Sequence, residues 1–239
     1  MNDYLAMVSE KFNVFRIATH FFYGKILSKR SFVVDLGANQ GDFANEIVSL
    51  FRCQCVAVEP LEKVRIEREN APLLQVVKWA VSDFNEVGTF YRSADPQSHS
   101  LFQVRREDIP IQVSTKKFGD WLEEEKIEVI VLLKVDIEGA EVFLFNTLSD
   151  QQLMNIKQIT IEFHDFLTGL NIYGQVQAIR TRLKKLGFEE FIFDPRYLMD
   201  CLYIQKTKVN MPFVTWVYLK SLAMWFRLRK FRLRILGKL

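Results

Sequence analysis

One stretch of the chain decides the fold: Phe32-Val33-Val34-Asp35-Leu36-Gly37-Ala38-Asn39-Gln40-Gly41-Asp42-Phe43. A run of β-branched and apolar residues ends in an acid, and two glycines follow it four positions apart. The pattern predicts a buried strand over 32–36, a tight turn, and a helix over 42–51. Glycine in the turn lets the backbone approach a ligand, and the first turn of the helix offers free N–H groups. The stretch therefore predicts a ligand-binding unit of strand, turn and helix.

The residues of the turn discriminate between three classes of ligand. A dinucleotide turn has the pattern G-x-G-x-x-G, but Asn39 replaces the middle glycine and Asp42 the last. A phosphate-binding P-loop needs G-x-x-x-x-G-K-[ST], which the stretch lacks. Asp35 and Asp42 flank the turn and would repel a pyrophosphate. They suit a cationic ligand instead, such as S-adenosylmethionine, which carries a sulfonium and an amino group.

Strands and helices alternate along the rest of the chain. Strands are expected at 32–36, 54–58, 74–80, 129–135, 157–163, 188–193 and 201–206. Helices are expected at 42–51, 61–69, 140–148 and 173–186. This alternation predicts an α/β fold, with a mainly parallel sheet covered by helices on both faces. The stretch 83–125 is less regular and is expected to meet the substrate, with a strand near 87–91, a polar loop at 93–100 and a helix near 116–125.

Composition and charge narrow the class of protein. The chain has 239 residues, of which 49% are hydrophobic, enough for one substantial core and against disorder. Residues 201–239 hold nine Lys or Arg and no acid, so residues 1–200 hold 23 bases against 29 acids. Such an acidic body makes general nucleic-acid binding unexpected. One domain with terminal additions is therefore expected.

The cysteines and the apolar runs bear on the cellular compartment. Cys53, Cys55 and Cys201 are an odd number and lack the spacing of a zinc site, which indicates buried thiols in a reducing compartment. The N-terminus shows no signal peptide, and no apolar run approaches the roughly 20 residues that span a bilayer. A cytoplasmic protein is expected.

Two further strand ends fit the same ligand. Strand 54–58 ends in Glu59-Pro60, 24 residues after Asp35, where an acid accepts the hydroxyls of a ribose. The third strand closes in Ala80-Val81-Ser82-Asp83, where backbone and the Asp83 side chain would cradle an adenine. The turn, the acid and this strand end follow one another in the order that a nucleoside ligand requires.

Five stretches together match the pattern of one known family. They are Val34-Asp35-Leu36-Gly37-Ala38-Asn39-Gln40-Gly41-Asp42-Phe43, Val56-Ala57-Val58-Glu59-Pro60, Ala80-Val81-Ser82-Asp83, Leu133-Lys134-Val135-Asp136-Ile137-Glu138-Gly139-Ala140-Glu141 and Ile161-Glu162-Phe163-His164. Over about residues 31–206 the sequence resembles the FkbM-type family of S-adenosylmethionine-dependent methyltransferases. The K-x-D-x-E-G-x-E block is the most specific part of this resemblance.

The resemblance implies a fold and an activity. The fold is a Rossmann-like class I methyltransferase core with a seven-stranded sheet. The activity is O-methylation of a hydroxyl on a sugar, a glycan, a glycolipid precursor or a secondary metabolite. The turn and the resemblance together assign these residues to the cofactor: Asp35, Gly37, Ala38, Asn39, Gly41, Asp42, Phe43, Glu59, Pro60, Ala80, Val81, Asp83 and Asp136.

Residues two apart in an extended segment point to the same side, and this spacing groups the candidate catalytic side chains. In an extended segment Lys134, Asp136 and Glu138 point to one side, and Glu162 and His164 share a side of the next strand. Methylation of a hydroxyl needs a group that takes the proton. His164 is the first candidate for this base because histidine titrates near neutral pH, and Asp136 is the second, as base or as the group that orients His164. Lys134 and Glu138 complete the predicted catalytic set.

Other roles for these residues stay open. Lys134 and Glu162 would also form a buried pair that braces two strands, and His164 would also be a structural histidine. No metal is assigned, although Asp136, Glu162 and His164, with Asp165, would suit a divalent ion. His20 and His99 lie outside this setting. His99 is expected in a solvated loop, and contact with the substrate is the alternative.

Other functions are weighed against the enzyme. A non-catalytic scaffold is disfavoured, because a retired site has no physical reason to keep so many partly buried acids. An NAD(P)-linked oxidoreductase is disfavoured by Asn39.

The two ends of the chain lie outside the resemblance. Residues 4–28 are expected to form an amphipathic helix, with Phe12, Phe15, Phe22 and Ile26 at helical spacing. The predicted organisation is a helical extension at 1–30, the methyltransferase domain at 31–208 and a basic amphipathic helix at 209–239.

The C-terminal helix allows more than one partner. Its predicted stripe over residues 212–236 consists of Phe213, Val217, Met224, Leu228, Phe231 and Ile235. Its bases at a spacing of seven are Lys220, Arg227 and Arg234, and its tryptophans are Trp216 and Trp225. The pattern fits a helix lying on the anionic inner face of a membrane. A helix docked on its own acidic body is the alternative, and a protein or RNA partner comes third.

Overall fold

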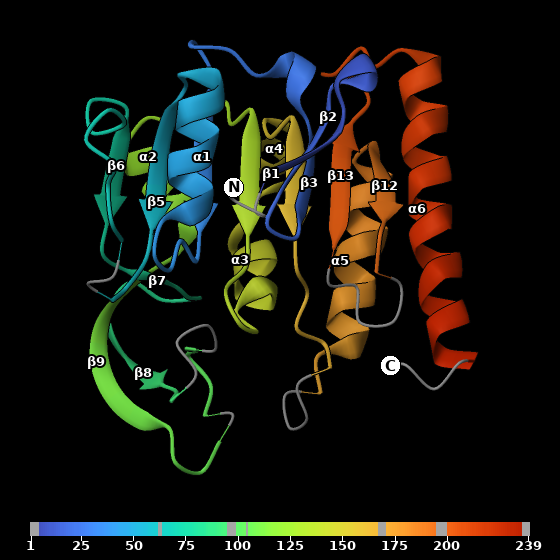
Figure 1. The fold of residues 1–239 in the computed structure, drawn as a ribbon. Helices are drawn as coiled ribbons and strands as arrows, with labels where there is room; N and C mark the ends of the chain where they lie inside the picture. Colours follow the sequence, from blue (N-terminus) through green and yellow to red (C-terminus); the bar gives the residue numbers. More distant parts are fainter. Residues whose placement is uncertain are drawn as a thin grey trace.

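A seven-stranded sheet runs through the centre of the molecule (Figure 1). The computed structural model describes residues 5–61, 64–94, 99–103, 105–166, 171–194 and 200–235. The strands, in spatial order, are β12 Phe188–Ile192, β13 Cys201–Gln205, β11 Gln158–Ile161, β10 Leu132–Val135, β4 Phe32–Leu36, β5 Gln54–Val58 and β6 Leu74–Val77. Neighbouring strands are parallel except for β13, which is antiparallel to β11 and β12. The predicted α/β class with a mainly parallel seven-stranded sheet is confirmed.

The order of the strands fixes where a ligand binds. β4 lies between β10 and β5, so the chain winds outward to one side through β5 and β6 and to the other through β10 and β11. The carboxyl ends of β4 and β10 therefore meet at the point where the winding reverses. In open parallel sheets the crevice at such a point receives the ligand.

A layer covers each face of the sheet (Figure 1). One layer is built from the helices α2 Phe118–Glu124, α3 Glu141–Thr147, α4 Asp150–Met154 and α5 Tyr173–Lys185. The other is built from α1 Asp42–Phe51, the N-terminal strands and α6 Phe213–Ile235. Successive residues of β4 point to opposite layers, with Val34 and Leu36 in one core and Val33 in the other. No helix in the described part of the chain is long and apolar enough to cross a bilayer.

The prediction of an N-terminal helix over 4–28 is wrong. These residues form an antiparallel sheet, with β1 Leu5–Ser9, β2 Val14–Ile17, β3 His20–Tyr23 and the short 3₁₀ turns η1 Glu10–Phe12 and η2 Gly24–Ile26. β-branched and aromatic residues dominate β2 and β3 and favour strands. Phe21 and Phe22 are both buried, in different cores, because β3 is covered on both sides. Burial on both sides removes the alternation that would have shown a strand.

A buried side chain of the main sheet holds this N-terminal sheet in place. The Gln158 amide, at the start of β11, accepts a hydrogen bond from the Tyr23 N–H at 2.9 Å and donates one to the Tyr23 C=O at 3.1 Å. Gln158 thus replaces the strand that would otherwise pair with the end of β3. Unpaired buried backbone groups are costly, so this one amide fixes the position of β3.

The stretch that follows β6 builds a second, smaller sheet. Its strands are β7 Ala80–Val81, β8 Val87–Arg92 and β9 Ile109–Lys116, in the order β7-β9-β8. Figure 1 shows β8 and β9 projecting past the carboxyl ends of the main sheet. The strand near 87–91 and the helix near 116–125 were expected, whereas β9 was not. The expected strand 74–80 ends at Val77, and its last residue belongs to β7.

The prediction of a helix over 61–69 is also wrong for the part that the structure describes, since 64–69 hold no helix. Asn45, on α1, takes the polar backbone groups of this segment: its amide donates to Arg65 C=O at 2.7 Å and accepts from Glu67 N–H at 3.0 Å. The Arg65 N–H donates to Gln40 C=O at 2.9 Å. Because the backbone is bound sideways to α1 and the turn, it cannot form the bonds of a helix.

Replacing Gln158 by leucine tests the anchoring of the N-terminal sheet. In Gln158→Leu two buried backbone groups of Tyr23 lose their partner, at about 1–3 kcal/mol for each group. The free energy of unfolding, measured by denaturant titration, should fall accordingly. Gln112→Leu is the matched control, because Gln112 lies on β9 with an exposed hydrogen bond to Thr89. Equal effects of the two substitutions would contradict the anchoring role.

Candidate active site

The glycine turn is pressed against the main sheet. The N–H groups of Gly37 and Ala38 both donate to the Val58 C=O, at 3.0 and 3.1 Å, and tie the turn to β5. Gly37 has a φ of +75°, and a Cβ there would lie 1.8 Å from the backbone oxygen of Asp136. Only glycine fits between β4 and the end of β10. The turn is therefore held at the reversal point of the sheet.

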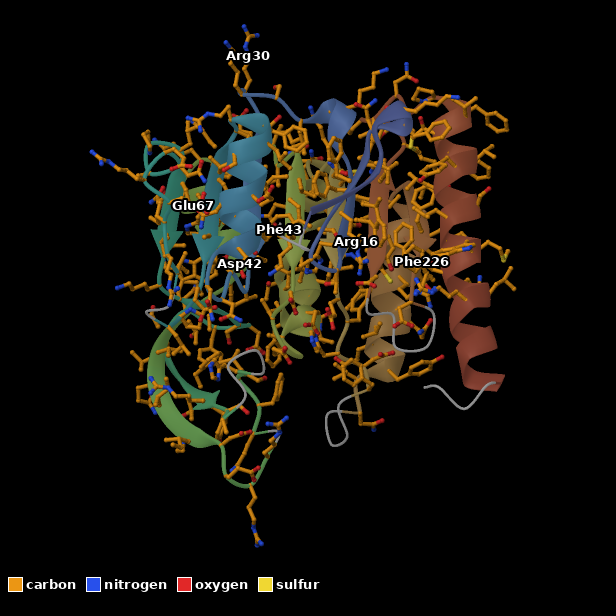
Figure 2. All side chains as sticks on the ribbon, viewed as in Figure 1. Arg16, Arg30, Asp42, Phe43, Glu67 and Phe226 are labelled. Carbon is orange, nitrogen blue, oxygen red and sulfur yellow. The ribbon has the colours of Figure 1, made fainter. Side chains whose placement is uncertain are left out.

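A cavity of about 750 Å³ opens beside this turn. Most residues assigned to the cofactor line it: Gly37, Ala38, Asn39, Asp42, Phe43, Glu59, Pro60, Ala80, Val81 and Asp136. The small sheet contributes Phe90, and the loop after it contributes His99 and Leu101. Figure 2 shows Asp42 and Phe43 at the end of α1 that faces this crevice. The structure thus brings the predicted residues together around one pocket.

Three residues assigned to the cofactor do not line the pocket. Asp35 is fully buried beneath the turn. Gly41 is closely packed against residues 64 and 65. A Cβ at position 41 would lie 2.8 Å from Val64. Asp83 is exposed outside the lining. Asp35 and Asp83 therefore lie outside the lining, and their contact with the cofactor stays a prediction.

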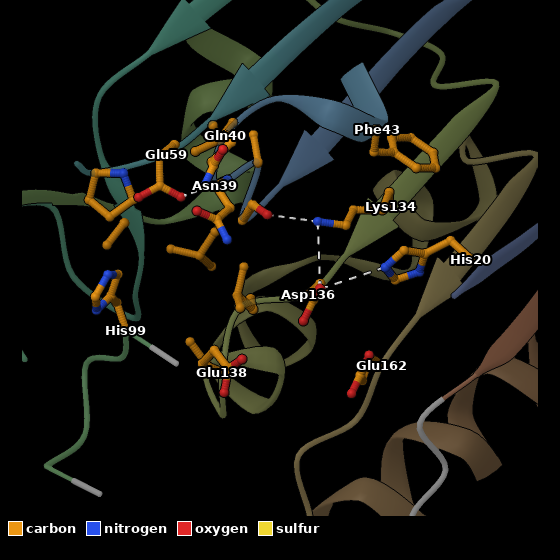
Figure 3. Close-up of a pocket in the computed structure, with 18 of the residues that line it drawn as sticks. His20, Asn39, Gln40, Phe43, Glu59, His99, Lys134, Asp136, Glu138 and Glu162 are labelled. Atoms are coloured by element: carbon orange, nitrogen blue, oxygen red, sulfur yellow. Dashed lines mark hydrogen bonds and ion pairs between the residues drawn. The ribbon is translucent and has the colours of Figure 1, made fainter. Parts of the chain in front are cut away.

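Glu59 is held rigidly at the pocket wall. Its Oε2 accepts a hydrogen bond from the Asn39 N–H at 2.9 Å, and its Oε1 accepts one from the Leu61 N–H at 3.1 Å. Figure 3 shows the bond that joins Glu59 to Asn39. The carboxylate thus links the end of β5 to the glycine turn and presents its charge at a fixed place in the pocket.

Lys134 is the cation beneath the turn. Its Nζ lies 3.0 Å from Asp35 Oδ1, donates to the Gly37 C=O at 2.7 Å, and lies 3.9 Å from Asp136 Oδ2. Burial by itself lowers the pKa of Lys134, but Asp35 and Asp136 outweigh it and raise the pKa. The direction of this shift favours a charged lysine. The expected pairing of Lys134 with Glu162 is replaced by pairing with Asp35.

His164 lies behind the wall of the pocket rather than in its lining. It is buried, it is not part of the pocket lining, and its Nδ1 lies 2.9 Å from Oε1 of the fully buried Glu141. Burial lowers the pKa of His164, but Glu141 and Glu138 outweigh this effect and raise it well above 6.5. A protonated imidazole cannot accept a proton. The direction of this shift favours a charged imidazole, and the role of His164 as a base stays a prediction.

Three acids of the pocket face this cation. The Nε2 of His164 lies 3.5 Å from Glu138, 3.8 Å from Asp136 and 3.9 Å from Glu162. Burial raises the pKa of Asp136, but Lys134 and His20 outweigh it, so this carboxyl stays ionised. Burial and the charge of Asp136 raise the pKa of Glu162 to about 7. One pocket thus holds a permanent carboxylate and a carboxyl that titrates near neutrality.

The same cluster offers the ligand atoms for a metal. Asp136, Glu138 and His164 each place one such atom within 4.8 Å of the others. The expected set of metal ligands contained Glu162, whereas the set in the structure contains Glu138 instead. A metal would need a neutral His164, whereas in this arrangement the imidazolium already neutralises the acids. We therefore treat the cluster as an ion-pair network.

The sequence missed a histidine in the pocket wall. His20 lies at the start of β3, lines the cavity, and points toward Asp136 (Figure 3). Its Nε2 lies 3.6 Å from Asp136 Oδ2, and its Nδ1 lies 3.4 Å from Thr160 Oγ1. Burial, aided by Lys134, lowers the pKa of His20 below 6.5 despite the charge of Asp136. His20 is thus neutral at pH 7 and has a carboxylate beside it.

Glu141 is the second residue that the sequence left without a role. It starts α3, is fully buried, and its Oε1 also accepts a hydrogen bond from the Gly139 N–H at 3.1 Å. The repeated acids of the K-x-D-x-E-G-x-E block were the only available signal. The structure shows that the last acid of the block orients His164 and supports its charge.

The charge of His164 is open to a direct test. In Glu141→Gln the imidazole loses its nearest carboxylate, so the pKa of His164 should fall toward its ordinary value. The chain has three histidines, so an NMR titration of the imidazole resonances resolves each one. The pKa of His99, which lies across the pocket, should not move. An unchanged pKa of His164 would contradict the ion-pair assignment.

The fold and the pocket together define a class of protein. A mainly parallel sheet with one antiparallel strand next to its edge, a glycine turn at the reversal point and an acidic pocket are the features of a class I methyltransferase. A family model described as "Methyltransferase FkbM domain" matches residues 35–190. The chain belongs to this family, and the predicted resemblance is confirmed. The N-terminal sheet, which carries His20, lies before the matched region.

Three curated relatives are similar to the chain. The 2-O-methyltransferase NoeI of Sinorhizobium fredii is 27% identical over 51% of this chain and 64% of its own. The AMB antimetabolite synthetase AmbE of Pseudomonas aeruginosa is 25% identical over 70% of this chain and 10% of its own. Methyltransferase 1 of Beauveria bassiana is 30% identical over 38% of this chain and 35% of its own. The chain therefore spans less than two thirds of the length of each relative.

Two solved structures show a more distant likeness. Precorrin-6y C5,15-methyltransferase from Geobacter metallireducens is 11% identical, with a TM-score of 0.37 over 75% of this chain and 80% of that one. The pyocyanin biosynthetic protein PhzM is 10% identical, with a TM-score of 0.32 over 76% of this chain and 52% of that one. At these scores the likeness adds nothing to the assignment, which rests on the family match and the strand order.

Proposed function

We propose that the protein is an S-adenosylmethionine-dependent O-methyltransferase that acts on a hydroxyl of a sugar, a glycan or a related metabolite. The observation that carries the proposal is the position of a neutral histidine, His20, beside an ionised carboxylate, Asp136, in the wall of the pocket. A methyltransferase that alkylates a hydroxyl must remove its proton, and this pair is suited to do so.

The residues of the pocket fit the cofactor chemically. Its lining holds five acids, Asp42, Glu59, Asp136, Glu138 and Glu162, against two bases, Arg16 and Lys134. Such an acidic lining suits a ligand with a sulfonium and an amino group. The buried Oδ1 of Asn39 has no hydrogen-bond partner within the described chain and lies at the pocket, where a polar ligand would satisfy it.

Each side of the pocket has a separate task. Glu59 and the backbone of the glycine turn would hold the nucleoside, and Ala80 and Val81 would line the space for its base. The cofactor, when bound, supplies a methyl group on a sulfonium and leaves as a neutral thioether. The chain's own contribution is to orient the acceptor and to hold its proton.

The proton of the acceptor hydroxyl would pass to Nε2 of His20. His20 can act in this way in the tautomer whose Nδ1–H donates to Thr160 Oγ1, because Nε2 then carries the lone pair. In the other tautomer Nε2–H would donate to Asp136 Oδ2, 3.6 Å away, and could not take a proton. Asp136 then stabilises the imidazolium that forms, because it stays ionised throughout. A base of this kind contributes about 10²–10⁴-fold to the rate.

The name of one relative supports the class of acceptor. NoeI is named a 2-O-methyltransferase, so a homologue of this family methylates an oxygen. Incubation of the protein with S-adenosylmethionine labelled in the methyl group and a panel of monosaccharides and lipid-linked sugars tests the proposal. Transfer of label to an oxygen of one acceptor supports it. Binding of NAD in place of S-adenosylmethionine, or transfer to nitrogen alone, would overturn it.

The cofactor assignment predicts a loss of affinity in Glu59→Gln. A charge-assisted hydrogen bond to a ligand contributes about 1.5–3 kcal/mol, or about 10- to 100-fold in affinity. Calorimetric titration with S-adenosylmethionine measures the change. Glu128→Gln, at an exposed position far from the lining, is the matched control and should bind normally. Equal affinities of the two variants would remove Glu59 from the cofactor site.

The proton-transfer assignment predicts a selective loss of turnover in His20→Gln. We expect kcat on the best sugar acceptor to fall at least about 100-fold, while affinity for S-adenosylmethionine changes little. His99→Gln is the matched control, because His99 also lines the pocket but lies across it from Asp136. A similar loss of turnover in both variants would contradict a specific role for His20.

The pH profile distinguishes His20 from Glu162 as the base. The histidine accepts a proton only while neutral, and its pKa lies below 6.5, so kcat/KM should reach half its maximum below pH 6.5 and stay level above it. Glu162 has a pKa of about 7, and as the base it would move this midpoint to about pH 7. A midpoint near 7 that disappears in Glu162→Gln would transfer the role to Glu162.

A further inference from the structure

We infer that the outward face of α6 is a docking surface for an anionic lipid membrane. The helix has two apolar faces, and the structure covers only one of them. The proposal concerns the described side chains of residues 213–229 and is independent of the reaction in the pocket.

One face of α6 is packed on the body. Leu219 and Ala223 are buried, and the Phe226 ring points from the helix toward the sheet (Figure 2). The ring centroid of Phe226 lies 5.5 Å from that of Phe21 on β3 and 6.1 Å from that of Phe193. The alternative of a helix docked on its own body is therefore correct for this face.

Lys220 belongs to the same docked face. Its Nζ donates to the Glu190 C=O at 2.9 Å, forms an ion pair with Glu189, and lies 4.7 Å from the centre of the Phe191 ring. The sequence placed Lys220 with Arg227 and Arg234 along the edge of the membrane stripe. The structure removes Lys220 from that set, and the side chain of Arg234 lies outside the described residues.

The opposite face is apolar and faces solvent. Six side chains there are between 40% and 73% exposed: Phe213, Val214, Val217, Met224, Trp225 and Leu228. They are six of the twelve large hydrophobic side chains that are exposed in the described part of the chain. At 100° per residue all six fall on one arc of about 120°. This arc contains most of the stripe that the sequence predicted.

The charges around this arc indicate which kind of surface would bind to it. Arg227 and Arg229 are exposed on either side of Leu228, and the Arg229 guanidinium lies 5.4 Å from the centre of the Trp225 ring. Residues 201–239 contain no acid. A second copy that met α6 across a two-fold axis would bring only bases to these bases. An anionic lipid surface offers both the apolar layer and the opposite charge.

The position of α6 agrees with such a surface. In Figure 1 the helix runs along the edge of the sheet, beyond β12, and nothing in the described chain covers its outer side. Its C-terminal turns, which carry the arginines, lie toward the same end of the molecule as the carboxyl ends of the parallel strands. Docking through the outward side of α6 would therefore leave the pocket, which lies beyond β12, β13 and β11, uncovered.

Vesicle sedimentation of the full-length protein tests the proposal. The vesicles are phosphatidylcholine, either pure or mixed with phosphatidylglycerol. The protein should sediment with the mixed vesicles at low ionic strength, and binding should weaken as the Debye length falls to about 8 Å. In Met224→Gln with Leu228→Gln the partition coefficient should fall about 10- to 100-fold, because the exposed parts of two apolar side chains are lost.

Two further double variants test the electrostatic part of the binding and its specificity for α6. Arg227→Gln with Arg229→Gln should lower binding to the mixed vesicles about 30-fold and change binding to neutral ones little. Val87→Gln with Ile109→Gln is the matched control, because these side chains on β8 and β9 are 67% and 61% exposed, and it should bind like the parent.

Two results would overturn the inference. The first is a full-length protein that stays in the supernatant with the mixed vesicles at low salt. The second is a dimer, seen by analytical ultracentrifugation, that the Met224→Gln and Leu228→Gln pair breaks, since the arc would then be covered by a second copy. Thermal unfolding of each variant is the folding control, and it should match the parent because these side chains contact solvent.

Discussion

The buried charge of Lys134 is the interaction on which the site depends. It lies between Asp35 of β4 and Asp136 at the end of β10, and it donates to the carbonyl of Gly37. Parallel strands direct their carboxyl ends to the same place, and two acids there would repel each other without a cation. Lys134 thus joins the two central strands, supports the glycine turn from below and keeps Asp136 ionised. Removal of one partner from such a network leaves the others buried and uncompensated.

The same network drives the pKa values of the pocket apart. Asp136 stays ionised chiefly because Lys134 lies beside it, and its charge then raises the pKa of the neighbouring Glu162. The acids on the His164 side hold a proton on that imidazole, whereas burial and Lys134 keep His20 neutral. Two histidines that approach different oxygens of one carboxylate thus differ in the direction of their pKa shifts. Environments that separate the pKa values of neighbouring groups are how a site assigns acid and base roles.

The sequence predicted what depends on local pattern and missed what depends on distant contacts. Strand 32–36, the glycine turn and helix 42–51 form one continuous signal, and the structure matches it. The N-terminal sheet was missed because Phe21 and Phe22 are both buried, so a strand shows no alternation. Residues 64–69 were mistaken because Asn45 binds their backbone from another element. His20 escaped notice for a related reason, since only the fold brings β3 to the end of β10.

A part of the chain outside the family region contributes to the wall of the pocket. The matched region starts at residue 35, so the core holds the turn and Glu59, whereas His20 comes from the N-terminal sheet. That sheet is fixed to the core by Gln158 and to α6 by the contact of Phe21 with Phe226. The histidine in the pocket wall and the exposed arc of α6 therefore belong to one packed layer on the same face of the main sheet. A family can keep one donor-binding core and change its acceptor through such a layer, because the layer reaches the pocket without altering the glycine turn or the strands that carry it.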